Sequence, residues 1–181
     1  MNRISATPAF KTNLSDGYQL PRVDRGFGIP RQASSGQRIV DYSVMEKEYK
    51  YDLSQADYES LLKIVQAEAG NEDEMGKMLV AGVVLNRVDS RRFPNTVTEV
   101  VMQQKGGVYQ FSPVAIGTYQ RTKASQETIE AVEKVLKGED YTEGALYFVS
   151  RKSADPEKMR WFDNSLTKLF EHGGHEFFTN P

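Results

Sequence analysis

The sequence predicts a mainly α-helical domain (α+β with little strand), preceded by an extended N-terminal arm. Apolar residues recur at helical spacing in several segments between residues 53 and 137, and strand-like alternation is rare. Residues 1–50 contain three Pro, four Gly and five Ser, and they lack a sustained period of 3.6 or 2. We therefore divide the chain into an extended or disordered arm, residues 1–50, and a folded domain, residues 51–181.

Composition excludes several classes of function. The chain has 181 residues and a net charge of −2, which gives no electrostatic footprint for nucleic acid. Cysteine is absent, so disulfides, thiolate metal sites and a cysteine nucleophile are excluded. No apolar run approaches the roughly 20 residues of a membrane span, and the first 30 residues lack the apolar core of a secretory signal. We expect a monomer without membrane insertion, metal or cofactor.

The first predicted helix covers residues 54–69. Ser54 and Asp57 have the spacing of a capping box, and Leu53 precedes them as a possible hydrophobic staple for Tyr58. Gly70 is suited to the left-handed position that follows a helix. Asn71 is then expected to cap a second helix with three acids, residues 72–74, in its first turn. Residues 78–85 are almost wholly apolar, so this second helix should be buried.

Weaker signals follow the second helix. Thr96 and Glu99 predict a short capped helix, and residues 125–137 predict a longer one that ends at Gly138. Residues 105–124 contain Gly, Pro and aromatic residues, which indicates a long loop. We expect an extended segment at 145–149 and a short helix near 165–170.

Glu68 stands where an apolar residue is expected. Leu61, Ile64, Val65 and Glu68 follow the i, i+3, i+4, i+7 pattern of one helix face. Burial disfavours the charged form of a carboxyl, and so does the negative end of a helix dipole, so both raise its pKa. A carboxyl that is protonated near neutral pH can act as a general acid. The alternative is a Glu at a frayed helix end, whose carboxyl lies in water.

Aromatic and polar side chains are interleaved in two segments. Tyr109, Gln110, Phe111 and Ser112 are consecutive, and Trp161 lies in a second polar stretch. Aromatic faces beside amide and hydroxyl groups are typical of a carbohydrate groove, although the same aromatic residues could form core. His172 and His175 flank two glycines, which makes a helical pair of metal ligands improbable.

Several motifs together resemble the SleB/CwlJ-type cell-wall hydrolases, the spore-cortex-lytic enzyme family. They are Ala-Glu-Ala-Gly-Asn-Glu at 67–72, Gly76, Val-Val-Leu-Asn-Arg-Val at 83–88, Gln-Phe-Ser at 110–112, Ala-Leu-Tyr-Phe at 145–148, Trp161, and Gly-His-Glu-Phe-Phe at 174–178. The resemblance spans roughly residues 55–179. Gly70-Asn71 replaces the Arg-Gly that many members have, and Asp73 replaces their Pro.

The resemblance implies a small lysozyme-like domain that cleaves peptidoglycan in the cell envelope or spore, for example during germination. It places the catalytic acid at Glu68 and a possible second acid at Glu72. The residues expected to bind substrate are Gln110, Phe111, Ser112, Tyr147, Trp161 and His175. Asn86 is expected to support the scaffold.

A single acid favours a lytic transglycosylase over a hydrolase, since hydrolysis of a glycosidic bond ordinarily needs two carboxylates. The alternatives are a hydrolytic muramidase, an N-acetylmuramoyl amidase, or a glycan-binding wall protein without activity.

Overall fold

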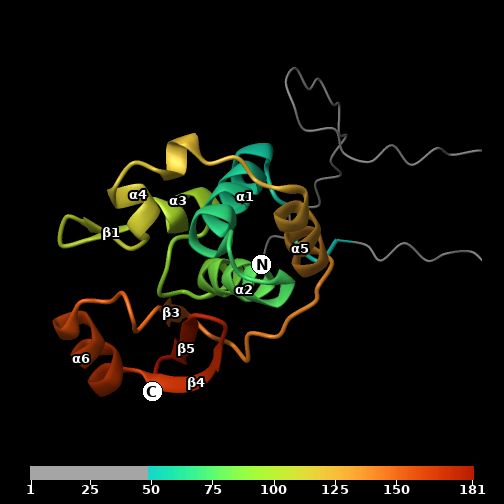
Figure 1. The fold of residues 1–181 in the computed structure, drawn as a ribbon. Coiled ribbons are helices and arrows are strands. Elements are labelled where there is room, and N and C mark those ends of the chain that lie inside the picture. Colours follow the sequence, from blue (N-terminus) through green and yellow to red (C-terminus); the bar gives the residue numbers. More distant parts are fainter. Residues whose placement is uncertain (1–48) are drawn as a thin grey trace, which may run out of the picture. The chain divides into compact units, whose positions relative to one another are not determined.

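The structure is a computed structural model that describes residues 49–181. The predicted arm, residues 1–50, therefore lies outside the described residues except for its last two. The prediction of a mainly helical domain with few strands is confirmed: helices form one part of the fold, and a small sheet with one further helix forms the other (Figure 1). No helix in the described part of the chain is long and apolar enough to cross a membrane.

Helix α1 (Gln55–Ala69) begins as the capping signal predicts. The Ser54 side chain accepts a hydrogen bond from the Asp57 backbone N–H. The end of the helix differs from the prediction, because Gly70 has φ −58° and ψ −28° and is right-handed. A Cβ atom at Gly70 would lie 2.5 Å from the Gln66 carbonyl oxygen. The close approach of the chain to the preceding turn thus explains glycine here, and a left-handed conformation does not.

Helix α2 (Glu74–Asp89) starts two residues later than predicted. The capping residue is Asp73, whose carboxylate accepts from the Gly76 N–H at 2.8 Å, so the prediction that Asn71 caps this helix is wrong. Only Glu74 lies in the first turn, which leaves Glu72 outside the helix. The prediction of a buried helix is confirmed, since almost every residue from Gly76 to Arg87 is buried.

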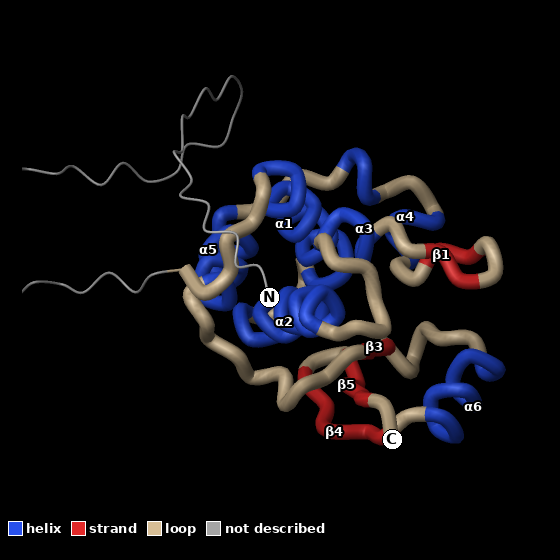
Figure 2. The backbone as a smooth tube through the Cα atoms, turned by 180° about the vertical axis from the view of Figure 1, so that it is seen from behind, coloured by secondary structure: helices blue, strands red, loops and turns tan. Residues whose placement is uncertain are grey.

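The helical core forms where α1 and α2 meet two further helices. These are α3 (Val97–Val101), capped by Thr96, and α5 (Gln126–Leu136), capped by Ser125. The Thr96 cap confirms its sequence signal, and α5 confirms the helix predicted at 125–137. Figure 2 shows α1, α2, α3 and α5 clustered together. Their facing sides bury a continuous set of aliphatic residues, including Leu61, Ile64, Val65, Val80, Val84, Val97, Val100 and Val132.

The segment 105–124 is not the long loop that we predicted. It contains most of a two-stranded hairpin, β1 (Gln104–Lys105) and β2 (Val108–Tyr109), and then helix α4 (Ser112–Ala115) and the 3-10 helix η1 (Tyr119–Arg121). Gly106 and Gly107 form the turn with φ of 60° and 79°, a conformation that favours glycine. Anchors such as Phe111 and Tyr119 bury this segment on the helical core.

A three-stranded antiparallel sheet completes the fold. Its strands are β3 (Tyr147–Val149), β4 (Thr167–His172) and β5 (His175–Thr179), in the order β3-β5-β4. The prediction of an extended segment at 145–149 is confirmed, whereas the helix predicted near 165–170 is wrong because that segment is β4. The helix in this region is α6 (Pro156–Ser165), capped by Asp155.

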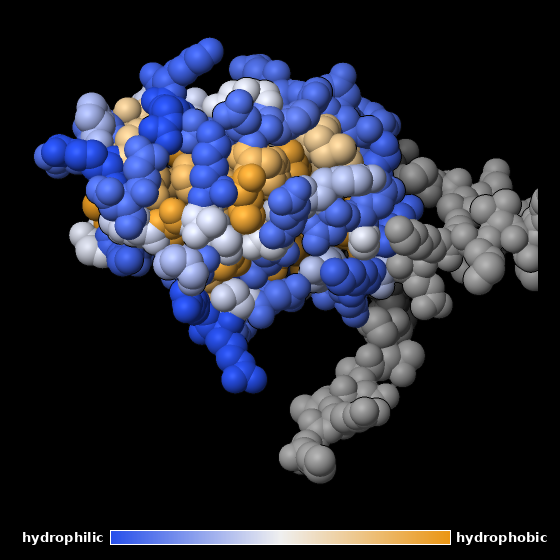
Figure 3. Space-filling model, turned by 90° about the horizontal axis from the view of Figure 1, so that it is seen from below, coloured by the Kyte–Doolittle hydropathy of each residue, from blue (hydrophilic) through white to orange (hydrophobic). Residues whose placement is uncertain are grey.

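Strand β5 is buried on both of its faces. Phe177 packs with Leu79 and Val83 of α2, while Phe178 packs with Met159 and Phe162 of α6. Successive residues of a strand point to opposite faces, so these two phenylalanines connect α2 and α6 to the same sheet. Strand β4, at one edge of the sheet, is less well covered and has no fully buried residue. Apolar side chains lie at the centre of the face seen in Figure 3, surrounded by hydrophilic ones.

Asn86 joins helix α2 to the segment that leads into β3. Its Nδ2 donates to Thr142 Oγ1 at 2.7 Å and to the Ala145 carbonyl at 3.0 Å, which agrees with the scaffold role expected for it. Asn86→Ala should lower the free energy of unfolding by about 2 kcal/mol, since it leaves a partly buried carbonyl unpaired. Urea unfolding would measure this loss. Asn164→Ala, on the exposed side of α6, is the matched control and should change stability by less than about 0.5 kcal/mol.

Candidate active site

A groove of about 140 Å³ lies between the helical core and the sheet with its helix α6. Elements distant in the sequence supply its walls: α1, α2, the 110–112 segment, β3 and the following loop, α6 and β5. The residues that line it are Glu68, Arg87, Gln110, Phe111, Ser112, Phe148, Val149, Ser150, Ser153, Ala154, Lys158 and His175. Glu68 is the only acid among them.

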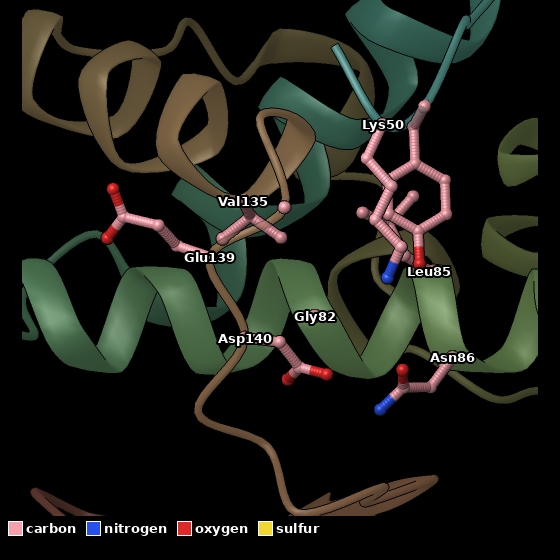
Figure 4. Close-up of a pocket in the computed structure, with 9 residues that line it drawn as sticks. Lys50, Gly82, Leu85, Asn86, Val135, Glu139 and Asp140 are labelled. Atoms are coloured by element: carbon pink, nitrogen blue, oxygen red, sulfur yellow. The ribbon is translucent and has the colours of Figure 1, made fainter. Parts of the chain in front are cut away.

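A second pocket, between α2, α5 and residues 50–51, is far smaller. Its volume is about 10 Å³, which leaves room for about one water molecule. Figure 4 shows Lys50, Asp140 and Asn86 beside Gly82 of α2 in this pocket. Gly82 is needed there because a Cβ atom would lie 2.4 Å from Thr142 Cγ2. This pocket is a packing feature, and the groove at Glu68 is the candidate site.

Glu68 enters the groove from the last turn of α1. Burial raises the pKa of this carboxyl to about 7, because an apolar environment disfavours the carboxylate. The positive charges of Lys158 and Arg87, together with a hydrogen bond from the Ser112 backbone N–H, act in the opposite direction. A substantial fraction of Glu68 is therefore protonated at neutral pH, as a general acid requires.

Four other predicted residues meet Glu68 in the groove: Gln110, Phe111, Ser112 and His175. Gln110 and Ser112 are exposed, so their amide and hydroxyl groups can reach a ligand. Phe111 is only 2% exposed and belongs to the core beneath the groove, where its ring lies 6.3 Å from that of Phe148.

Tyr147 and Trp161 lie beside each other but are not among the lining residues of the groove. Their ring centroids are 6.0 Å apart in an edge-to-face arrangement. Trp161 is 43% exposed and sits on helix α6, where the sequence predicted no helix. Lys105 of the β1–β2 hairpin places its Nζ 5.9 Å from the indole centroid, so the hairpin and α6 approach each other at this point.

Glu72 lies outside the groove, against the turn between β4 and β5. Its Oε1 is 3.9 Å from His175 Nδ1, and a Cβ atom at Gly173 would collide with its carboxylate. Its backbone carbonyl accepts a hydrogen bond from Lys77 Nζ. These contacts tie the α1–α2 connection to helix α2 and to the β4–β5 turn.

The two histidines differ in environment. His175 is buried at 8% exposure, and burial lowers its pKa although the nearby Glu72 raises it. His172 pairs with Asp73 at 2.8 Å. Within residues 49–181, no cluster of three or more His or acidic side chains is arranged to hold a metal ion.

Sequence reasoning missed two cations of the site. Lys158 extends from α6, a helix that the prediction lacked, and Arg87 is the last buried residue of α2. Asp155-Pro156 is a helix-start signal that would have placed Lys158 on a helix. The burial of Arg87 has no comparable signal, because its neighbours come from segments distant in the sequence.

Comparison with known proteins places the chain in a family. A sequence model of the cell wall hydrolase family matches residues 71–178, which is more than half of the chain. The chain belongs to the cell wall hydrolase family. The matched segment contains every candidate site residue except Glu68, which precedes it by three residues.

Individual relatives of the chain carry names that agree with this family. A spore cortex-lytic enzyme of Bacillus cereus is 33% identical over 66% of this chain and 44% of its own length. The cell wall hydrolase CwlJ of Oceanobacillus iheyensis is 30% identical over 60% of this chain and 77% of its own length. The chain thus spans less than half the length of the first of these relatives.

Solved structures of this family share the fold. The catalytic domain of the germination-specific lytic transglycosylase SleB from Bacillus anthracis superposes with a TM-score of 0.58 at 31% identity, over 70% of this chain and 96% of that domain. The catalytic domain of Bacillus cereus SleB gives a TM-score of 0.59 at 29% identity, over 72% of this chain.

Proposed function

We propose that this chain cleaves the MurNAc-β-1,4-GlcNAc bond of peptidoglycan as a lytic transglycosylase, with Glu68 as its single acid/base. The observation that carries the proposal is the desolvated carboxyl of Glu68 in a groove lined by polar and aromatic groups. The names of its relatives, a spore cortex-lytic enzyme and a lytic transglycosylase, support the same substrate class and an action in the cell envelope or spore.

The proposed reaction has two proton transfers at one carboxyl. Protonated Glu68 donates its proton to the bridging oxygen while the bond from this oxygen to muramoyl C1 breaks, which releases the GlcNAc hydroxyl. The Glu68 carboxylate then takes the proton of the muramoyl C6 hydroxyl, and the C6 oxygen bonds to C1. The product is a 1,6-anhydromuramoyl end, no water is consumed, and Glu68 regains its proton.

The absence of a second acid among the groove-lining residues supports this outcome over hydrolysis. A hydrolase with retention or inversion ordinarily uses two carboxyl groups that face the same bond. Glu72 was our candidate for a second acid, but its carboxylate contacts the β4–β5 turn. We infer that Glu72 supports the site through His175 and takes no proton from the substrate.

The other groove residues are assigned to substrate binding. Gln110 and Ser112 would hydrogen-bond sugar hydroxyl or acetamido groups, and His175 would do so in its neutral form at the groove wall. Phe111 would support these groups from below. Tyr147 and Trp161 would extend the groove as an apolar platform for a neighbouring sugar ring.

Trp161→Ala is expected to raise KM for glycan strands about 10-fold with a much smaller effect on kcat. The substitution removes a stacking surface that contributes about 1.4 kcal/mol to the free energy of substrate binding. Initial rates on solubilised glycan strands would measure this. Ile116, which is 71% exposed and does not line the groove, offers a matched apolar truncation, Ile116→Ala, that should leave KM unchanged. A rise in KM for both variants would argue against a specific role of Trp161.

Mass spectrometry of digested peptidoglycan tests the reaction type. The proposal predicts fragments that end in 1,6-anhydro-MurNAc, which are 18 Da lighter than hydrolytic products because water is not added. Reducing MurNAc ends without the anhydro form would indicate a muramidase. Free stem peptides with intact glycan strands would indicate an amidase. Digestion of spore cortex and vegetative wall side by side would also show which glycan is preferred.

A further inference from the structure

Arg87 is a buried cation that the proposed reaction leaves unused. The residue is 6% exposed and lines the groove. Its Nε donates to the Leu146 carbonyl at 2.7 Å, whereas its Nη1 is buried and has no hydrogen-bond partner among residues 49–181. Burying a guanidinium with an unpaired donor opposes stability. A feature that costs stability in a groove calls for a role in the chemistry of that groove.

Three aromatic rings surround the Arg87 guanidinium. Its Cζ lies 5.0 Å from the ring centroid of Phe111, 5.2 Å from that of Phe93 and 5.5 Å from that of Tyr147. Aromatic faces attract a cation electrostatically and so replace part of the hydration that burial removes. Burial lowers the pKa of Arg87 to about 10, and the residue is therefore still charged at neutral pH. The fold thus maintains a positive charge where water cannot screen it.

We propose that Arg87 is a positioning residue that acts through Glu68: its buried charge sets the proton affinity of this carboxyl and stabilises the carboxylate that forms once the glycosidic oxygen has taken the proton. The two side chains line the same groove without a direct ion pair, and each charge acts on the pKa of the other group. This inference rests on the proposed function in taking Glu68 as the acid.

The other groups that face Glu68 are separable from Arg87. Lys158 of α6 also favours the carboxylate, the Ser112 N–H of α4 donates to it, and His175 of β5 lines the same groove. Helices α3 and α5 and the 3-10 helix η1 pack on α1 but contribute no charge to this effect. Lys158 is exposed, so salt screens its charge, whereas a buried charge is screened much less. Ionic strength therefore distinguishes the two cations.

The experiment compares Arg87→Met, Arg87→Gln and Arg87→Lys with the wild type. Methionine fills the aromatic site without a charge or an unpaired donor, and exchanges of this kind are often tolerated. Two quantities are measured at low and at high salt: the alkaline limb of the pH profile of kcat/KM, and the titration midpoint of Glu68 by ¹³C NMR of its side-chain carboxyl. Melting temperatures establish that each variant is folded.

The proposal predicts that Arg87→Met and Arg87→Gln raise the Glu68 midpoint by about 1 pH unit or more at both salt concentrations, the size of effect that one nearby charge has. The alkaline limb should move with it, while kcat falls because Glu68 becomes a weaker acid. Arg87→Lys should restore the midpoint to within a few tenths of a unit. For the control variant Lys158→Gln, the rise in the Glu68 midpoint should become smaller as salt is added.

A folded Arg87→Met variant with an unchanged Glu68 midpoint would overturn the proposal, whatever its activity, because a purely structural role of Arg87 lowers activity without moving the midpoint. The proposal would also be overturned if Arg87→Lys shifted the Glu68 midpoint as far as Arg87→Met does. The carboxyl titration does not depend on the product formed. If the enzyme proved to be a muramidase or an amidase, the proposed function would fail while this result stood.

Discussion

Replacing Glu68 by Gln is expected to lower the rate of wall lysis by about 10²–10⁴-fold, the usual contribution of a general acid. Glutamine keeps the shape of the side chain but has no proton of suitable acidity to give to the bridging oxygen. Release of soluble fragments from purified peptidoglycan measures the rate. Circular dichroism should show that the variant keeps its helices, since Glu68 lies at the end of α1 and no packing is lost.

Glu72→Gln is the matched control for this loss. The two glutamates are one helical turn apart in sequence, but only Glu68 lines the groove. We expect Glu72→Gln to retain activity within about 10-fold, with any loss traced to the His175 contact. If Glu72→Gln abolished lysis and Glu68→Gln did not, the catalytic acid would be Glu72 and our assignment would be wrong.

Glu68→Gln is also expected to stabilise the folded protein at alkaline pH. A carboxyl whose pKa rises from an ordinary 4.5 to about 7 on folding disfavours the folded state, by about 3 kcal/mol, once it ionises. The folded state binds more protons than the unfolded state between these two values. Stability of the wild type therefore falls as pH rises from about 4.5 to 7 and then levels off, and the neutral amide avoids this loss.

Urea unfolding of both proteins at pH 4 and pH 9 tests this second prediction. At each pH, the free energy of unfolding of the wild type is subtracted from that of the Gln variant. This difference should be up to about 3 kcal/mol larger at pH 9 than at pH 4. All other titrations are shared by the two proteins and cancel in the comparison. A difference that does not change with pH would mean that Glu68 titrates as an exposed glutamate, and the physical basis of its role as an acid would be lost.

Local signals predicted helices α1, α2, α3 and α5. Ser54 and Thr96 each cap the helix that the sequence assigns to them, because a capping side chain needs only a backbone N–H a few residues further along the same chain. The start of α2 was wrong because two cap residues, Asn71 and Asp73, stand two apart. Asp73 is the one whose carboxylate meets the Gly76 N–H.

Elements that depend on distant partners were less predictable. Residues 167–172 form a strand because they pair with β5, and no local pattern indicated this pairing. The same limit applies to the site. Glu68 could be found from its place on an apolar stripe, whereas Arg87 is brought beside it only when α1, α2 and the β3 segment pack together.

The titration of the Glu68 carboxyl in the wild-type protein tests the central claim most directly. In the proposed reaction the groove keeps a large fraction of this acid protonated near neutral pH, so that one residue can first donate and then accept a proton. A ¹³C NMR titration should give a midpoint near pH 7. A midpoint near 4.5, the ordinary value for a glutamate, would contradict the account.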